Sequence, residues 1–394
     1  MNKLSKNIWA LGVVSLLTDL SSEMLTPVLP LFLANVLKVD KSIIGLIEGI
    51  AESTASLLKV YSGWLSDRIN ARKILIFAGY GLSALAKPIL LLATGWPTVL
   101  GYRFVDRIGK GIRSSPRDAI IADSIAETDR GMAFGFHKMM DTTGAVLGPL
   151  VAYLILAKYP FAFSKVFWAA IIPAVLGVAC ILFFVRDKKI IRAAAKPLPS
   201  FNIRVMGPSF GKFLIVILLF SLATFSEAFL ALRAQDMNIK LAAVPLLFLF
   251  FNLIAALLAY PTGVISDRIG RKGTLLFGYS LFCLVNLGFA FGAKPIHAWL
   301  LFALFGLYSG ATAGVQKAMV VDLVAPELRG TALGTYNSAV GIAAFPASLL
   351  AGILWQNFGA PAPFIFAAVI SLIASILFYF LIPGKTDRIL QDFS

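Results

Sequence analysis

Long apolar stretches fill most of this sequence and constrain its fold more than any other feature. A helix needs about 20 apolar residues to cross ~30 Å of hydrocarbon, and twelve windows reach that length when breaks are placed at charged and Pro/Gly clusters. Only 14% of the residues are charged, against about 25% in soluble domains. The sequence therefore predicts an all-α membrane protein with twelve transmembrane helices, at 8–36, 42–66, 72–94, 97–122, 130–157, 162–185, 212–234, 241–266, 273–293, 296–324, 329–356 and 361–383.

Lys and Arg are distributed unevenly between the predicted loops. A polar segment rich in both, RDKKIIRAAAKPLPSFNIRVMGPSFGK, separates the sixth span from the seventh. By the positive-inside rule this side is cytoplasmic, and we expect both termini there, in a cell inner membrane. The net charge of +15 belongs to loops and membrane helices, and no nucleic-acid motif accompanies it. The opposite loops carry only Lys38, Lys41, Lys158, Lys165, Lys240 and Lys294.

Three short segments of the first half recur in order in the second half. GWLSDRI (63–69) returns as GVISDRI (263–269), and ADSIAETDRGMAFG (122–135) returns as VDLVAPELRGTALG (321–334). SSEM around Glu23 matches FSEA around Glu227. Nearly constant offsets of about 200 residues indicate a duplicated unit. We predict two pseudo-symmetric six-helix bundles, residues 1–185 and 212–394, joined by a cytoplasmic linker at 186–211.

The two halves, the linker and the loop after the second span resemble the major facilitator superfamily. The second-half loop, GVISDRIGRKG, fits the family pattern G-x-x-x-D-R-x-G-R-[RK], whereas the first-half copy, GWLSDRINARK, has Asn70 in place of a Gly. In that family the loop latches the cytoplasmic side shut, and the alternative is a plain interfacial turn. The resemblance implies gating roles for Gly63, Asp67, Arg68, Gly263, Asp267, Arg268 and Arg271.

The fifth span contains a second family resemblance. GAVLGPL (144–150) is similar to the G-x-x-x-G-P core of a motif associated with proton-coupled antiporters, although Val151 and Ala152 follow where the fuller motif has glycines. Small residues four apart let a neighbouring helix approach closely, and a proline offers a bend. The resemblance implies a gating function for Gly144, Gly148 and Pro149, with plain helix packing as the alternative.

The fourth span contains an unusual stretch, YRFVDRIGKGIRSSPRDAIIAD (102–123). A charge at the bilayer centre costs at least ~2.5–3.5 kcal/mol, so such residues must pair or face water. The resemblance puts spans 1, 4, 7 and 10 around a central cavity. It implies a substrate site at Glu23, Arg103, Arg107, Lys110, Glu227 and Lys317, with Tyr336 and Asn337 among the second-half lining. Arg113 and Arg117, nearer the cytoplasmic end, are expected in the inner gate.

The sign of the substrate depends on how these charges pair. Acids on spans 1, 2 and 4 balance the cations, and Glu48 and Glu52 could pair with Arg103 or Lys59. An anionic substrate is therefore favoured only by the two or three cations expected on the cavity face, since guanidinium groups bind carboxylate or phosphate bidentately.

Glu23 is the first candidate for proton coupling. Burial favours the protonated form of a carboxyl group and a nearby Arg favours the ionised form, so a group between them can change state. Asp19 and Asp141 are the next candidates. The alternative is a permanent ion pair of Glu23 with Arg107 or Arg103.

The sequence as a whole predicts a monomeric secondary transporter that works by alternating access. We expect it to export a small organic molecule in exchange for protons; the alternative is a symporter or facilitator that imports a small organic anion. No nucleophile–base pair, cofactor motif or metal-ligand set is apparent, so we expect neither an enzyme nor a metal site. The proton gradient is the expected driving force, and the lipid bilayer and a small-molecule substrate are the expected partners.

Overall fold

The chain folds into long helices, and no strand occurs in the part of the chain that the structure covers. The computed structural model describes residues 4–69, 72–126, 129–186 and 203–382. The elements are α1 (Lys6–Leu25), α2 (Val28–Asn35), α3 (Lys41–Ile69), α4 (Arg72–Ala86), η1 (Lys87–Leu92), α5 (Trp96–Asp123), α6 (Arg130–Lys158), α7 (Phe163–Phe184), η3 (Ile203–Met206), α8 (Pro208–Ala223), α9 (Ala228–Asp236), η4 (Leu241–Ala243), α10 (Val244–Ile269), α11 (Arg271–Phe291), α12 (Pro295–Asp322), η5 (Pro326–Leu328), α13 (Arg329–Phe358) and α14 (Pro361–Leu381).

These helices make the twelve predicted spans and confirm the all-α membrane fold. Ten spans within the described ranges are long and apolar enough to cross a membrane by length and composition. The other two are α3 and α5, which have 29 and 28 residues. They fall outside the apolar set because they contain most of the charges at membrane depth, and they pack against each other inside the first bundle.

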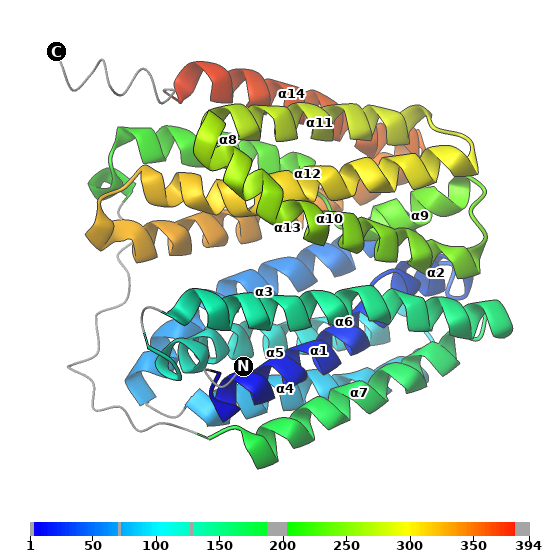
Figure 1. Cartoon of the computed structure of the whole chain (residues 1–394). Coiled ribbons are helices and arrows are strands. Elements are labelled where there is room, and N and C mark those ends of the chain that lie inside the picture. The colour runs from blue at the N-terminus through cyan, green and yellow to red at the C-terminus, as the bar shows by residue number, and fades with distance from the viewer. Residues whose placement is uncertain (1–3, 70–71, 127–128, 187–202, 383–394) are drawn as a thin grey trace.

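The helices form two bundles, α1–α7 and α8–α14 (Figure 1). α1 begins and α14 ends on the same side of the molecule, at the left of Figure 1. We call this side the termini side and the opposite one the far side. α8 begins at Pro208, before the predicted start of the second bundle at 212, and most of the predicted linker lies outside the described residues.

The bundles meet on the far side and separate on the termini side (Figure 1). α3 lies along α13, α6 along α10, and α2 against α9. A Cβ added to Gly45 of α3 would stand 2.2 Å from the Ser348 carbonyl oxygen, so the α3 and α13 backbones touch. These contacts between the bundles close the molecule on the far side. On the termini-side halves of α5 and α12, Lys110 and Lys317 are exposed.

The seventh span is broken, contrary to the single helix predicted over 212–234. α8 ends at Ala223 and α9 begins at Ala228, with residues 224–227 between them. The Ser226 amide donates to Ser348 Oγ (3.1 Å) on α13, which satisfies backbone that the break frees. The first span is divided as well, where Pro27 separates α1 from α2.

Candidate functional site

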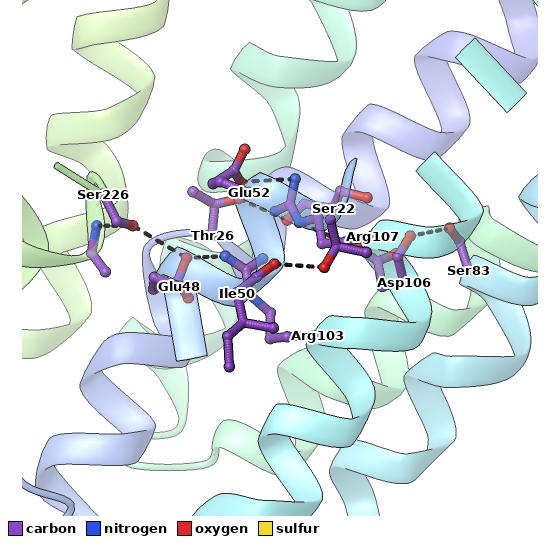
Figure 2. Close-up of polar contacts among 12 residues, drawn as sticks. Ser22, Thr26, Glu48, Ile50, Glu52, Ser83, Arg103, Asp106, Arg107 and Ser226 are labelled. Carbon is purple, nitrogen blue, oxygen red and sulfur yellow. Dashed lines mark hydrogen bonds and ion pairs between the residues drawn. The ribbon is translucent and has the colours of Figure 1, made fainter. Parts of the chain in front are cut away.

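The charged stretch of α5 pairs with α3. Arg103 forms an ion pair with Glu48, and both side chains are buried. Arg107 Nη1 lies 3.1 Å from Glu52 Oε1. The Glu52 side chain is 41% exposed, so this second pair sits at an edge that solvent reaches. Figure 2 shows both pairs side by side. Both glutamates therefore pair with an arginine of α5, and neither forms an ion pair with Lys59, the alternative partner predicted from the sequence.

The opposite side of α5 faces α4. Ser83 Oγ donates to the Asp106 carbonyl oxygen (3.1 Å), and Arg113 Nη1 donates to Ser83 Oγ (2.6 Å). The Arg113 guanidinium also lies over the Tyr80 ring, 4.4 Å from its centre. Arg117 pairs with its neighbour Asp118 at 2.9 Å. Both predicted gate arginines thus make these contacts inside the first bundle, and their gating role stays a prediction.

One carboxylate joins the α5 network to the second bundle. Ser226 Oγ donates to Glu48 Oε2 at 3.2 Å, the oxygen that also receives Arg103 (Figure 2). Ser226 lies in the break between α8 and α9, next to Glu227. Ser226 was not predicted from the sequence, because an uncharged serine at membrane depth carries no strong signal.

Two of the predicted coupling carboxyls meet. Asp19 of α1 and Asp141 of α6 interact electrostatically. Asp141 also accepts from Ser15 Oγ (2.9 Å) and lies 2.7 Å from Lys138 Nζ. Asp141 is therefore held by two side chains, whereas Asp19 has no ion-pair partner within 4.0 Å among the described residues.

The small residues of α6 pack against α1 beside these carboxyls. A Cβ on Gly144 would stand 3.0 Å from Asp19 Cβ and 2.4 Å from the Leu16 oxygen. A Cβ on Gly148 would stand 2.9 Å from Glu23 Cβ. Pro149 follows inside α6 and is buried. The GAVLGPL segment therefore fixes the backbone of α1 at the two predicted coupling positions.

Glu23, Lys110 and Glu227, all predicted at the substrate site, have no ion-pair partner within 4.0 Å among the described residues. Glu23 interacts electrostatically with Lys110 and Arg107, and Glu227 interacts with Glu23 and Lys110. The permanent pair of Glu23 with an arginine, held open as an alternative above, does not form in this part of the structure.

The other second-half candidates are Lys317, Tyr336 and Asn337. Lys317 is exposed on α12. Tyr336 Oη donates to Gln316 Oε1 (2.8 Å), whose amide nitrogen donates to Tyr279 Oη (3.1 Å). Asn337, the next residue of α13, is half-buried. Gln316 was not predicted, although it immediately precedes Lys317 in the span matched to the fourth.

The loop residues predicted to gate stay within their own bundle. Arg271 pairs with Asp267 and lies 3.3 Å from Asp322 Oδ2, which ties α10, α11 and α12 together. Arg268 is exposed, and a Cβ on Gly263 would meet nothing within 4 Å. In the first-half copy Gly63 packs near Ser115. The side chains of Asp67 and Arg68 lie outside the described residues.

An amide pair closes the far side. Asn35 at the end of α2 donates to Gln235 Oε1 (3.0 Å), and Gln235 on α9 donates back to Asn35 Oδ1 (2.9 Å). Their numbers differ by 200, the offset of the GWLSDRI repeat. The pair was missed because neither amide is charged, although aligning the repeats would have matched the two positions.

No group of three or more His, Cys, Asp or Glu side chains that could hold a metal ion occurs in the residues the structure describes. The charges of the site are balanced by one another, and its free groups are carboxyl and ammonium groups. This arrangement suits the reversible binding of protons and of a polar small molecule.

Comparison with known proteins identifies the family. The family model described as Major Facilitator Superfamily matches residues 11–233 and 213–391. An uncharacterized MFS-type transporter of Methanocaldococcus jannaschii is 36% identical over 394 residues, covering 96% of each chain. The multidrug resistance protein MdtG of Proteus mirabilis is 24% identical and covers 94% of each chain.

A solved structure shares the fold at low sequence identity. The nucleoside transporter NupG superposes with a TM-score of 0.84 at 12% identity, over 95% of this chain and 100% of that one. At this identity the likeness concerns the arrangement of the helices alone.

Proposed function

Because the chain belongs to the Major Facilitator Superfamily and is a multi-pass membrane transporter rather than an enzyme, we propose that it exports a small organic molecule in exchange for protons. We place it in the cell inner membrane as a monomer, with both termini cytoplasmic, as the loop charges favour. The termini side is then the cytoplasmic side, and the structure is a cytoplasm-facing state of an alternating-access cycle.

One observation carries the antiport proposal: the GAVLGPL segment packs against α1 at Asp19 and Glu23. Gly148 brings the α6 backbone against the α1 backbone at Leu20, beside the Cβ of Glu23, and Gly144 does the same at Leu16, beside the Cβ of Asp19. A segment similar to an antiporter motif therefore touches two of the candidate proton carriers. Any bend of α6 at Pro149 would move these carboxyls relative to α5, which supports coupling between helix movement and proton binding.

The carboxyls divide the coupling task in this proposal. Glu23 forms no ion pair within 4.0 Å in the described residues and interacts electrostatically with Lys110. In this proposal it exchanges a proton when the cavity opens to either side. Asp19 and Asp141, which interact electrostatically, are the next candidates to carry a proton. A substrate that enters between Glu23, Lys110 and Glu227 would alter the charge balance that decides whether Glu23 keeps its proton.

The pairing of Arg103 and Arg107 changes the substrate expectation. Both guanidiniums are matched by glutamates, so binding an anion there requires displacing Glu48 or Glu52. Of the cations predicted at the substrate site, Lys110 and Lys317 remain for an anionic group, while Glu227 and Glu23 would meet an amine or a hydroxyl. We propose a polar substrate that contacts these four residues, with Tyr336 and Asn337 on the second-half side.

The test combines a ligand search with a flux measurement. Purified protein is screened by thermal shift against metabolites, siderophores and cationic drugs, and a stabilising compound is loaded into proteoliposomes with a pH-sensitive dye. We expect protons to move against the compound under an imposed pH gradient. Compound flux that ignores the gradient contradicts antiport.

Glu23→Gln locates the coupling. We expect this variant to lose the pH dependence of transport and to keep exchange of preloaded compound, because neutral Gln cannot release a proton. Gly135→Ala is the control. A Cβ at Gly135, also on α6, meets nothing within 4 Å, so this variant should keep the wild-type pH profile. An unchanged profile in Glu23→Gln would assign coupling to Asp19 and Asp141.

The second candidate is import of a small organic anion by symport or facilitation. It is favoured by the exposure of Lys110 and Lys317. The same proteoliposomes separate the two, because a symporter moves protons and the anion in the same direction and a facilitator moves no protons.

A further inference from the structure

Lys87 is a buried cation outside the proposed substrate and proton-coupling residues. It begins η1, directly after α4, and is 1% exposed. Its Nζ atom has no hydrogen-bond partner among the described residues. A buried ammonium group must be compensated by a nearby charge, so the question is which group Lys87 serves.

The counter-charge is Asp106. Lys87 begins η1, which packs against α5, and the Lys87 and Asp106 side chains interact electrostatically. They do not come within ion-pairing distance in the described structure, and Asp106 Oδ1 is also without a hydrogen-bond partner. A gap between two such groups is commonly bridged by solvent. α5 lies between α3 on one side and α4 with η1 on the other, so Lys87 approaches Asp106 from the side away from Glu52.

Arg107 stands between two carboxylates. Its Nη1 is 3.1 Å from Glu52 Oε1, and its Nε is 3.8 Å from Asp106 Oδ2. Figure 2 shows Glu52 and Asp106 on either side of this guanidinium. Asp106 is 5% exposed, so an unneutralised Asp106 would attract Arg107 strongly in a medium of low dielectric constant. Glu52, which solvent reaches, would compete poorly.

We propose that Lys87 is a positioning residue of the transport site, which neutralises Asp106 from behind α5 and so leaves Arg107 to hold Glu52. The proposal rests on the proposed function only in calling this edge the transport site. Lys87 thereby decides whether Glu52 is capped by a guanidinium or is free to meet a substrate.

The test reads the state of Glu52 directly and needs no substrate. Proteins in detergent are treated with a water-soluble carbodiimide and an amine, and mass spectrometry measures the labelled fraction of Glu52, normalised to exposed Asp40. Arg107→Gln sets the level of labelling for an uncapped Glu52. We expect Lys87→Met to approach that level, because Asp106 then takes Arg107.

Two further variants make the result specific. Lys87→Met combined with Asp106→Asn should return Glu52 to the protected wild-type level, because the competing carboxylate is gone. Asp106→Asn alone should keep Glu52 protected but melt at a lower temperature, since it strands the Lys87 charge. Lys240→Met, which removes an exposed lysine, is the control for charge loss and should match the wild type in both readouts.

The outcomes separate the possibilities. Labelling of Glu52 at the wild-type level in Lys87→Met overturns the proposal. Labelling that stays high in the double variant also overturns it, because Lys87 would then act without Asp106. If Lys87→Met does not fold, a double variant that folds with Glu52 protected supports the pair, and one that fails to fold rejects it. Failure of proton antiport would leave every one of these labelling results unchanged.

Discussion

At the scale of single residues, equal spacing lets two charged helices form two successive ion pairs, which we call the rungs of an ion-pair ladder. Arg103 and Arg107 are four residues apart on α5, as Glu48 and Glu52 are on α3. Both helices run from the far side to the termini side, so a shared rise of about 1.5 Å per residue keeps the rungs in register. The Arg103–Glu48 pair is buried, and Glu48 also accepts a hydrogen bond from Ser226, whereas Glu52 of the Arg107–Glu52 pair is exposed to solvent.

The two rungs should differ in stability. Arg103→Ala leaves a buried glutamate without a counter-charge, and we expect it to lower the free energy of unfolding by about 3–5 kcal/mol. Arg107→Ala should cost less, because Glu52 is 41% exposed and exposed pairs contribute only about 0–1 kcal/mol. Unfolding in mixed detergent–SDS micelles measures both. The double variant Arg103→Gln/Glu48→Gln should lose less than Arg103→Ala, and equal losses for the two alanine variants would contradict the burial argument.

The charges themselves were predictable from sequence, but their partners were not. The sequence left Arg103 and Lys59 open as partners of Glu48 and Glu52, because an uncertainty of several residues at each helix end does not fix the register of two helices. Packing decides it, since Gly111 of α5 fits against Leu58 and fixes the register of the two helices. Single-sequence reasoning has no access to such a contact.

At the scale of elements, glycines set how closely the helices approach. Gly144 and Gly148 let α6 touch the α1 backbone at Asp19 and Glu23, and a Cβ at Gly148 would stand 2.7 Å from the Leu20 carbonyl oxygen. Backbone cannot give way as a flexible side chain can, so a larger residue must displace α1. Gly135, on the same helix, has open space at its Cβ.

Matched substitutions on α6 test this contact. We expect Gly148→Leu to lower the melting temperature and to slow transport strongly, because overpacking costs about 1–3 kcal/mol or more and moves Glu23. Gly135→Leu should leave both properties close to the wild type. Similar effects at the two positions would show that helix propensity, rather than contact with α1, governs the response.

The helix breaks show where the sequence signal ends. Pro27 marks the division of the first span, as proline should. The break at 224–227 has no such marker, because its residues TFSE contain neither Gly nor Pro. It is stabilised from outside, by Ser348 on the Ser226 amide and by Glu48 on the Ser226 hydroxyl group. A break that depends on tertiary contacts is visible only in the folded molecule.

The α2–α9 contact gives a test of alternating access. In a Cys180→Ala/Cys283→Ala background, Asn35→Cys with Gln235→Cys places two thiols across the far-side pair. We expect a short bifunctional thiol reagent to stop transport and a reductant to restore it, because the bundles must part there for the far side to open. Each single cysteine variant should be insensitive, and full transport by the cross-linked protein would contradict far-side opening between α2 and α9.

At the scale of the whole molecule, the halves share an architecture and divide the chemistry. The two Arg–Glu ion pairs between α3 and α5, and the carboxyls Asp19 and Asp141, belong to the first bundle. The second bundle contributes Glu227 and Lys317 beside aromatic and amide groups such as Tyr336 and Gln316. The repeats in the sequence predicted the architecture, and the uneven distribution of charge predicted this division, because both are properties of residue type and order.

The open side of the molecule can be mapped with one thiol. In the same cysteine-free background, Lys110→Cys should react with a membrane-impermeant maleimide in inside-out vesicles and should be protected in right-side-out cells, because Lys110 is exposed on the half of α5 that ends on the termini side. Reaction from the outside only would reverse the proposed orientation. Lys240→Cys, on a far-side loop, should give the opposite pattern.

The amide pair at the far side has a consequence for how such a chain can arise. An amide donates and accepts at once, so it can bond to a copy of itself across a twofold axis, which a lysine or an aspartate cannot do. Asn35 and Gln235 occupy corresponding positions of the two repeats and bond reciprocally. The contact is therefore an isologous one within a single chain. Two separate copies of the first half, related by a true twofold axis, could close on each other through Asn35 alone.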